Sequence, residues 1–183
     1  MFLPSRAWIR SGPTHLERGK HPFCHILPRA LGLGVSDNGA ATQILLVEDD
    51  PHDAELTLRA LKTRILSNQL TWAHDPVEAL KIIFGPEGDG HGEVRCRPKL
   101  ILLDMKMPKL NGLDLLRRLK SNDETKSIPV VMLTSSREER DLKECYKLGV
   151  NSYIVKPINY EAFCEVVEHL RLYWLVINQS PQN

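Results

Sequence analysis

One stretch of the sequence decides the fold: residues 100–112, which read LILLDMKMPKLNG. Four aliphatic residues followed by a carboxylate are typical of a parallel strand that is buried on both faces. Asp104 then lies at the carboxyl end of this strand, where open α/β sheets place their ligands. Pro108, Asn111 and Gly112 predict a turn into the next helix. The stretch therefore predicts a buried strand that presents one carboxylate at a sheet edge, although taken alone it also allows Asp104 to be a loop cap.

The rest of the chain alternates short apolar runs with amphipathic segments. Further strands are predicted at residues 43–47, 70–73, 128–133 and 152–155. Five strands alternating with five helices predict an α/β fold with a parallel sheet, right-handed crossovers and helices on both faces. The second helix is predicted from Asp75–Pro76 to Phe84. The third and fourth are marked by apolar residues at helical spacing, namely Leu113, Leu116 and Leu119, and Leu142, Cys145 and Tyr146. One buried face is predicted for the first helix, formed by Ala54, Leu58, Leu61 and Ile65, and one for the last, formed by Phe163, Val166, Val167, Leu170, Trp174 and Ile177.

Length and composition favour one domain with an additional segment. The 183 residues carry a net charge of +1 and are 42% hydrophobic, which argues against DNA binding and against disorder of the whole chain. No apolar run reaches the roughly 18 residues of a membrane helix, and the scattered cysteines show no metal-binding spacing. We therefore expect a soluble, cytoplasmic protein with a flexible proline- and glycine-rich arm at residues 1–42 and a short tail at residues 179–183.

Polar side chains follow several of the predicted strands. Glu48 and Asp49 follow the first strand, and Asp104, Thr134 and Lys156 end the third, fourth and fifth. At one sheet edge, carboxylates about 4 Å apart repel each other by ~4 kcal/mol per pair at an effective dielectric constant near 20. A hard dication relieves that repulsion, and Mg²⁺ fits a site with few carboxylates. The pattern predicts a Mg²⁺ site at which Asp104 attacks a phosphoryl group, aided by the lysine ammonium and the threonine hydroxyl.

Four motifs in combination resemble the receiver domain of two-component response regulators, the CheY-like proteins. They are Val47–Asp49, Leu103–Pro108, Leu133–Ser135 and Tyr153–Pro157. The resemblance covers residues 43–178, which we therefore expect to form the receiver domain. It implies a flavodoxin-like sheet of five parallel strands in the order 2-1-3-4-5.

The resemblance also implies a role for each matching residue. Asp104 would be the phosphoacceptor, and Thr134 with Tyr153 the switch pair. Two departures are minor: Ser135 replaces the usual alanine after the switch threonine, and the additional Asp50 leaves open which acids face the metal. The remaining implied roles are Mg²⁺ binding by Glu48, Asp49, Asp104 and the backbone carbonyl of Lys106, and phosphoryl binding by Lys156.

Weaker features resemble the single-domain regulators of bacterial phytochrome-like histidine kinases. They are the long loop before the central strand, residues 127–131, and residues 173–175 at the end of the last helix. This resemblance implies a protein that accepts a phosphoryl group from a sensor histidine kinase and then changes its partner binding. The alternative is a phosphorelay intermediate or a phosphate sink. In either role it would assist its own phosphorylation and dephosphorylation rather than act as an enzyme on a separate substrate.

Three rival functions share parts of the pattern. A flavodoxin-like electron carrier would need a phosphate-binding first loop, which Glu48, Asp49 and Asp50 would repel. A haloacid-dehalogenase-type phosphatase would need a second acid where Lys106 stands. A pseudo-receiver would bind a partner without phosphorylation, yet every group that phosphorylation needs is present.

The end of the last helix predicts a homodimer. Beyond Leu170 the chain is apolar on nearly every side of the helix, since Leu172, Tyr173, Leu175 and Val176 add to the predicted buried face. A helix that is apolar all round must be covered. A second copy would cover it through a symmetric patch with aromatic anchors, whereas folding back onto its own domain is the alternative.

Overall fold

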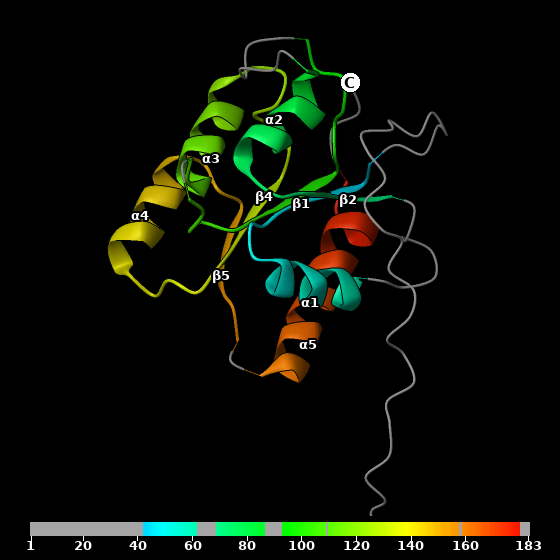
Figure 1. The fold of residues 1–183 in the computed structure, drawn as a ribbon, viewed down its shortest axis with the longest axis vertical. Coiled ribbons are helices and arrows are strands. Elements are labelled where there is room, and N and C mark those ends of the chain that lie inside the picture. Colours follow the sequence, from blue (N-terminus) through cyan, green and yellow to red (C-terminus); the bar gives the residue numbers. More distant parts are fainter. Residues whose placement is uncertain (1–41, 62–68, 87–92, 109, 158, 180–183) are drawn as a thin grey trace, which may run out of the picture. The chain divides into compact units, whose positions relative to one another are not determined.

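The computed structural model describes residues 42–61, 69–86, 93–108, 110–157 and 159–179 (Figure 1). The predicted arm, apart from residue 42, and residues 180–183 of the predicted tail lie outside the described residues. So does Ile65, which was predicted on the buried face of the first helix. In the ranges that are described, none of the helices combines the length and the apolar character needed to cross a membrane.

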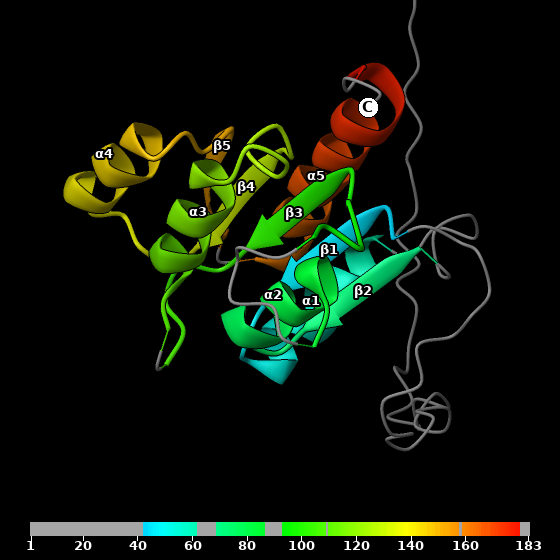
Figure 2. The ribbon, with the colours of Figure 1, turned by 90° about the horizontal axis from the view of Figure 1, so that it is seen from above.

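Five parallel strands form one sheet in the order β2-β1-β3-β4-β5. This result confirms the predicted flavodoxin-like architecture and strand order. All five carboxyl ends lie on one edge, because every pairing is parallel (Figure 2). The strands are β1 (Ile44–Val47), β2 (Leu70–Ala73), β3 (Leu100–Leu103), β4 (Val130–Thr134) and β5 (Ser152–Val155).

The five predicted helices are all present. Four of them begin at a side chain that caps the free backbone amides: Asp50 accepts from His52 N and Asp53 N, Asp75 from Glu78 N, Asn111 from Asp114 N, and Asn159 from Ala162 N. The helices are α1 (Pro51–Leu61), α2 (Pro76–Phe84), α3 (Gly112–Ser121), α4 (Glu139–Lys147) and α5 (Tyr160–Arg171), which continues as the π-helical segment η1 (Leu172–Ile177).

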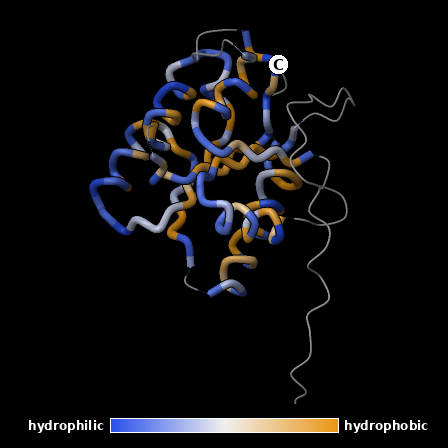
Figure 3. Tube along the Cα trace, in the orientation of Figure 1, coloured by the Kyte–Doolittle hydropathy of each residue, from blue (hydrophilic) through white to orange (hydrophobic). Residues whose placement is uncertain are grey.

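Helices cover both faces of the sheet. Helices α1 and α5 pack on one face around Leu46, Leu102 and Val167, and α2, α3 and α4 pack on the other around Leu103 and Leu116. Figure 3 shows hydrophobic segments running along the central strands, between hydrophilic outer turns of the helices. Residues of β1 and β3 are at most 1% exposed, so burial on both faces accounts for their uninterrupted aliphatic sequences.

Two of the apolar residues from which the helices were predicted are exposed, and for Ile177 this contradicts the predicted buried face. Tyr146 on α4 is 54% exposed, because this polar helix buries only Cys145. Ile177 is 60% exposed, because the chain widens from α-helical to π-helical hydrogen bonding before it. Asn178 N donates to Tyr173 O, a five-residue spacing, at 2.7 Å. That spacing rotates later side chains away from the α-helical face on which the prediction relied.

Gly112 allows the first turn of α3 to press against the strand end that carries Asp104. Its amide donates to Met105 O at 3.0 Å. A Cβ at this position would collide with the backbone carbonyl of Asp104 and lie 2.9 Å from Met105 Cα. Only a residue without a side chain allows this approach, so the predicted turn also positions the central carboxylate.

We predict that Gly112→Ala lowers the free energy of unfolding by roughly 2–4 kcal/mol, because backbone rather than a flexible side chain must move. Gly149→Ala is the matched control. Gly149 has a φ of +88°, but a Cβ there would meet only Lys120 side-chain atoms at 3.8 Å. The control should therefore lower the free energy of unfolding by about 1 kcal/mol, from backbone strain alone. Urea unfolding measures both variants, and equal losses would contradict the proposed close approach.

Candidate functional site

Three carboxylates converge at the carboxyl ends of β1 and β3. Oxygen atoms of Glu48, Asp49 and Asp104 lie within 4.8 Å of one another. The backbone of Glu48 is held by β2 on both sides: its amide donates to Ala73 O at 3.1 Å, and Trp72 Nε1 donates to its carbonyl at 2.9 Å. Glu48 and Asp104 are buried. The structure thus brings together the three acids that the sequence predicts as a cluster.

Lys156, at the end of β5, is the cation of this cluster. Its Nζ lies 2.7 Å from Glu48 Oε2 and 3.3 Å from Asp104 Oδ1. The same nitrogen lies 2.7 Å from Asp53 Oδ2 in the first turn of α1. Two of these carboxylates are almost fully buried, with 4% and 7% of their side chains exposed, so the ammonium offsets charge that water cannot reach.

Burial leaves this cluster electrostatically unsatisfied. It raises the pKa of Glu48 to about 7, although Lys156 acts in the opposite direction. Burial likewise raises the pKa of Asp104, opposed by Lys156 and by the Lys106 amide, which donates to Asp104 Oδ2 at 2.9 Å. For Lys156, burial alone would lower the pKa, but hydrogen bonds to Asp53 and Glu48 raise it above its usual value. One ammonium is therefore insufficient to make these acids ordinary carboxylates.

The donor set fits a hard divalent cation. Oxygen ligands of carboxylates are what Mg²⁺ and related ions select, and a second positive charge would favour ionisation of Glu48 and Asp104. Asp50 is not part of the cluster, because it is exposed and its Oδ1 accepts from the amides of His52 and Asp53 as a helix cap. The ligand role of the Lys106 carbonyl remains a prediction.

The predicted switch residues are linked through Ser136. Thr134 Oγ1 accepts from Ser136 N at 3.0 Å, and the Tyr153 hydroxyl donates to Ser136 O at 3.1 Å. The Ser136 hydroxyl in turn donates to Asp141 Oδ2 on α4 at 2.7 Å. The loop from β4 to α4 therefore connects the buried threonine to the tyrosine ring.

Two contacts of the site were missed by the sequence analysis. Asp53 lies in the first turn of α1, directly after the strand end that carries Glu48 and Asp49, so the sequence already placed it near this edge of the sheet. Its partner Lys156 is 103 residues away, however, and only the fold joins them. The hydrogen bond from Trp72 Nε1 to Glu48 O was missed because a tryptophan in a strand is usually interpreted as a core residue that packs, not as a hydrogen-bond donor.

Comparison with protein families matches residues 44–168 to the response regulator receiver domain. Among curated proteins, the probable methanogenesis regulatory protein FilR2 of Methanothrix harundinacea is 38% identical over 75% of this chain and 86% of its own length. Response regulator Rcp1 of Synechocystis sp. is 37% identical over 72% of this chain and 88% of its own length.

Solved structures agree with the sequence comparisons. The phosphorylated cyanobacterial phytochrome response regulator RcpA matches with a TM-score of 0.69 and 34% identity, over 78% of this chain and all of its own. The Mn²⁺-bound form of Rcp1 matches with a TM-score of 0.67 and 34% identity, over 77% of this chain and 99% of its own. These matches confirm the receiver interpretation over a flavodoxin-like carrier or a dehalogenase-type phosphatase.

We predict that Glu48→Gln stabilises the metal-free protein at pH 8 by roughly 1–3 kcal/mol, because it removes a buried charge. Folded Glu48 holds its proton up to a pKa of about 7, whereas the unfolded value is 4.5. Between these values the folded state binds more protons, so the wild type loses stability as the pH rises. The gain of the variant should therefore shrink toward zero as the pH falls to 5.

Urea unfolding in a chelating buffer at several pH values measures this effect. Glu139→Gln is the control, because its side chain is 77% exposed and pairs only with Lys143 among the ion pairs of the described chain. The control should change stability little at any pH. A stability gain of Glu48→Gln that does not vary with pH would contradict the buried charge.

Proposed function

The chain belongs to the response regulator receiver domain family, and on that premise we propose that Asp104 accepts a phosphoryl group from the phosphohistidine of a sensor kinase. The observation that carries the proposal is the placement of Asp104. It is a buried carboxylate at the end of the central strand, 3.3 Å from the ammonium of Lys156 and clustered with two further acids. One sheet edge therefore combines the proposed nucleophile with a cation and with acids of the kind that bind divalent ions.

The transfer itself needs little covalent chemistry from the protein. A carboxylate oxygen of Asp104 attacks phosphorus, the P–N bond of the phosphohistidine breaks, and its electron pair remains on the departing imidazole. Lys156 binds the equatorial oxygens, and the Thr134 hydroxyl donates a hydrogen bond to them. Mg²⁺, held by Glu48, Asp49, Asp104 and the Lys106 carbonyl, would neutralise phosphoryl charge when bound.

We further propose that Thr134 and Tyr153 convert phosphorylation into a change of partner binding. An anion on Asp104 attracts the threonine hydroxyl, which is bonded to the Ser136 amide. Movement of this loop also moves the Ser136 carbonyl, to which the Tyr153 hydroxyl donates. The tyrosine ring packs at the edge of the core beneath α4, so the bistable element is the packing of this ring and loop.

The proposed partner is a histidine kinase of the phytochrome-like class. RcpA carries the name of a phytochrome response regulator, and this chain is 34% identical to it. The protein would act as a phosphoacceptor that assists its own phosphorylation and dephosphorylation rather than as an enzyme on a separate substrate. Because kinase phosphohistidines are made from ATP, the proposed location is the cytoplasm.

A homodimer through the end of α5 and η1 is the second proposed partnership. Leu172, Tyr173, Val176 and Ile177 are all at least 42% exposed, and Tyr173 stacks edge-on against Trp174 with ring centroids 5.0 Å apart. Trp174 and Leu175 pack back onto the core of the same chain. The exposed apolar residues are therefore available to a second copy about a two-fold axis.

We predict that acetyl phosphate with Mg²⁺ adds one phosphoryl group to the wild-type protein and none to Asp104→Asn, because the amide is a poor nucleophile. Intact-mass spectrometry measures the adduct. Asp114→Asn, a change at a half-exposed acid on α3, should leave the adduct unchanged. Omission of the divalent cation should abolish it. An adduct on Asp104→Asn would contradict the assignment.

We predict that the wild-type protein is a dimer at micromolar concentration, and that Tyr173→Ala with Val176→Ala weakens association at least about tenfold by removing central apolar contacts. Light scattering measures the mass. Tyr146→Ala removes an equally exposed tyrosine from α4 and should leave the dimer intact. A wild-type monomer in both phosphorylation states would rule out this interface.

A further inference from the structure

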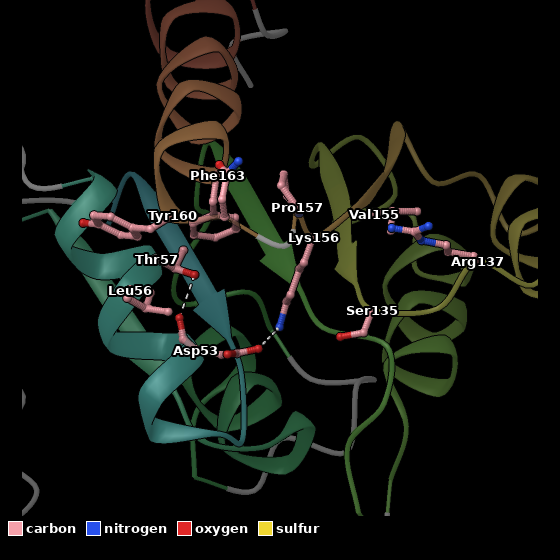
Figure 4. A pocket seen from close by; sticks show the side chains of 11 residues that line it. Asp53, Leu56, Thr57, Ser135, Arg137, Val155, Lys156, Pro157, Tyr160 and Phe163 are labelled. Carbon is pink, nitrogen blue, oxygen red and sulfur yellow. Dashed lines mark hydrogen bonds and ion pairs between the residues drawn. The ribbon is translucent and has the colours of Figure 1, made fainter.

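The ammonium of Lys156 contacts three carboxylates, and the two nearest ones do not belong to Asp104, the proposed phosphoacceptor. Its Nζ lies 2.7 Å from both Asp53 Oδ2 and Glu48 Oε2, but 3.3 Å from Asp104 Oδ1. Figure 4 shows the lysine reaching from the end of β5 toward Asp53 on α1. Two of the three N–H donors of the ammonium are hydrogen-bonded to Glu48 and Asp53, whereas Asp104 makes the longer ion pair. A phosphoryl group on Asp104 that binds Lys156 closely therefore draws the ammonium away from Glu48 or Asp53.

The three carboxylates differ in how well they tolerate the loss of Lys156. The side chains of Glu48 and Asp104 are 4% and 7% exposed, whereas that of Asp53 is 42% exposed. A buried carboxylate that loses its cation stays desolvated and uncompensated, which is strongly unfavourable. Asp53 would instead be hydrated on release. It borders a cavity of about 400 Å³ whose lining also includes Ser135, Arg137 and Tyr160.

Asp53 is also held in place independently of Lys156. It lies in the first turn of α1, where its amide donates to the capping carboxylate of Asp50 at 3.1 Å. Its carbonyl accepts from Thr57 Oγ1 at 2.9 Å. These bonds hold the backbone of Asp53, so its carboxylate stays within reach of the lysine whether or not the ion pair is formed.

We propose that Asp53 competes with the phosphoryl group for Lys156 and so sets how tightly the site holds a phosphoryl anion. The inference rests on the proposed role of Asp104 as phosphoacceptor. In the resting protein the lysine is bound to Asp53, and on phosphorylation that contact is exchanged for a phosphoryl oxygen. Asp53 is not needed to place the lysine, because Glu48 and Asp104 already hold it from the buried side.

The test is the affinity for beryllofluoride, which binds a carboxylate as a phosphoryl mimic, measured by fluorine NMR in saturating Mg²⁺. Asp53→Asn keeps the shape of the side chain and removes its charge. We expect this variant to bind the mimic about five- to tenfold more tightly than wild type, an effect kept modest by the solvent exposure of Asp53. Glu55→Gln is the matched control, because this acid is exposed on the same helix and pairs with Arg59. Asp53→Glu restores the charge and should return the affinity to near that of wild type.

A crystal structure of Asp53→Asn supplies a second readout, in which Lys156 Nζ should lie closer to Asp104 than 3.3 Å. Equal affinities of the wild type, Asp53→Asn and Glu55→Gln would overturn the proposal. Weaker binding by Asp53→Asn would also overturn it, because Asp53 would then position the lysine rather than compete for it. If the wild type bound no beryllofluoride and gained no phosphoryl group, the proposed function itself would fail. If the wild type binds beryllofluoride, the proposed function stands, and the behaviour of the Asp53 variants then decides this inference alone.

Discussion

The ion pairs of Lys156 are the interaction on which the site depends. They join β5 to β1, β3 and α1, across 108 residues of sequence in the case of Glu48. A parallel sheet gathers its carboxyl ends on one edge, and here that edge carries several acids. Without the ammonium, two nearly buried carboxylates would face each other with no compensating charge. The lysine therefore stabilises the buried acids of the cluster, and its partial compensation leaves the cluster receptive to a divalent cation.

The buried carboxylate of Glu48 lowers the stability of the fold but serves the proposed metal binding. Glu48 would be more stable as a neutral residue, since burial raises its pKa to about 7. A neutral residue would, however, lose the negative charge that attracts a divalent cation. The backbone contacts from β2 hold Glu48 at this costly place, because Trp72 and Ala73 fix both its amide and its carbonyl. Burial of the aliphatic core beneath Glu48 offsets the unfavourable free energy of this site.

The two ends of the fold serve different purposes. The carboxyl edge of the sheet holds the polar cluster, and the loop from β4 to α4 links it to Tyr153 through Ser136. The end of α5 instead continues as η1, where a wider helical spacing turns Val176 and Ile177 toward solvent. The proposed phosphorylation site and the proposed dimer interface therefore lie on different parts of the domain. The first is charged, and the second is apolar and exposed.

The sequence by itself determined the strands, their order through the resemblance, and the acids and lysine at the strand ends, because these features are local or repeat along the chain. Uninterrupted aliphatic runs require burial on both faces, and side chains at parallel strand ends must meet. The fold as a whole, rather than any local pattern, brought Asp53 to Lys156 and Trp72 to Glu48. It also decided the exposure of Tyr146 and Ile177. The physical reason is that each depends on distances between segments far apart in sequence, or on a local change of helical spacing that periodicity does not reveal.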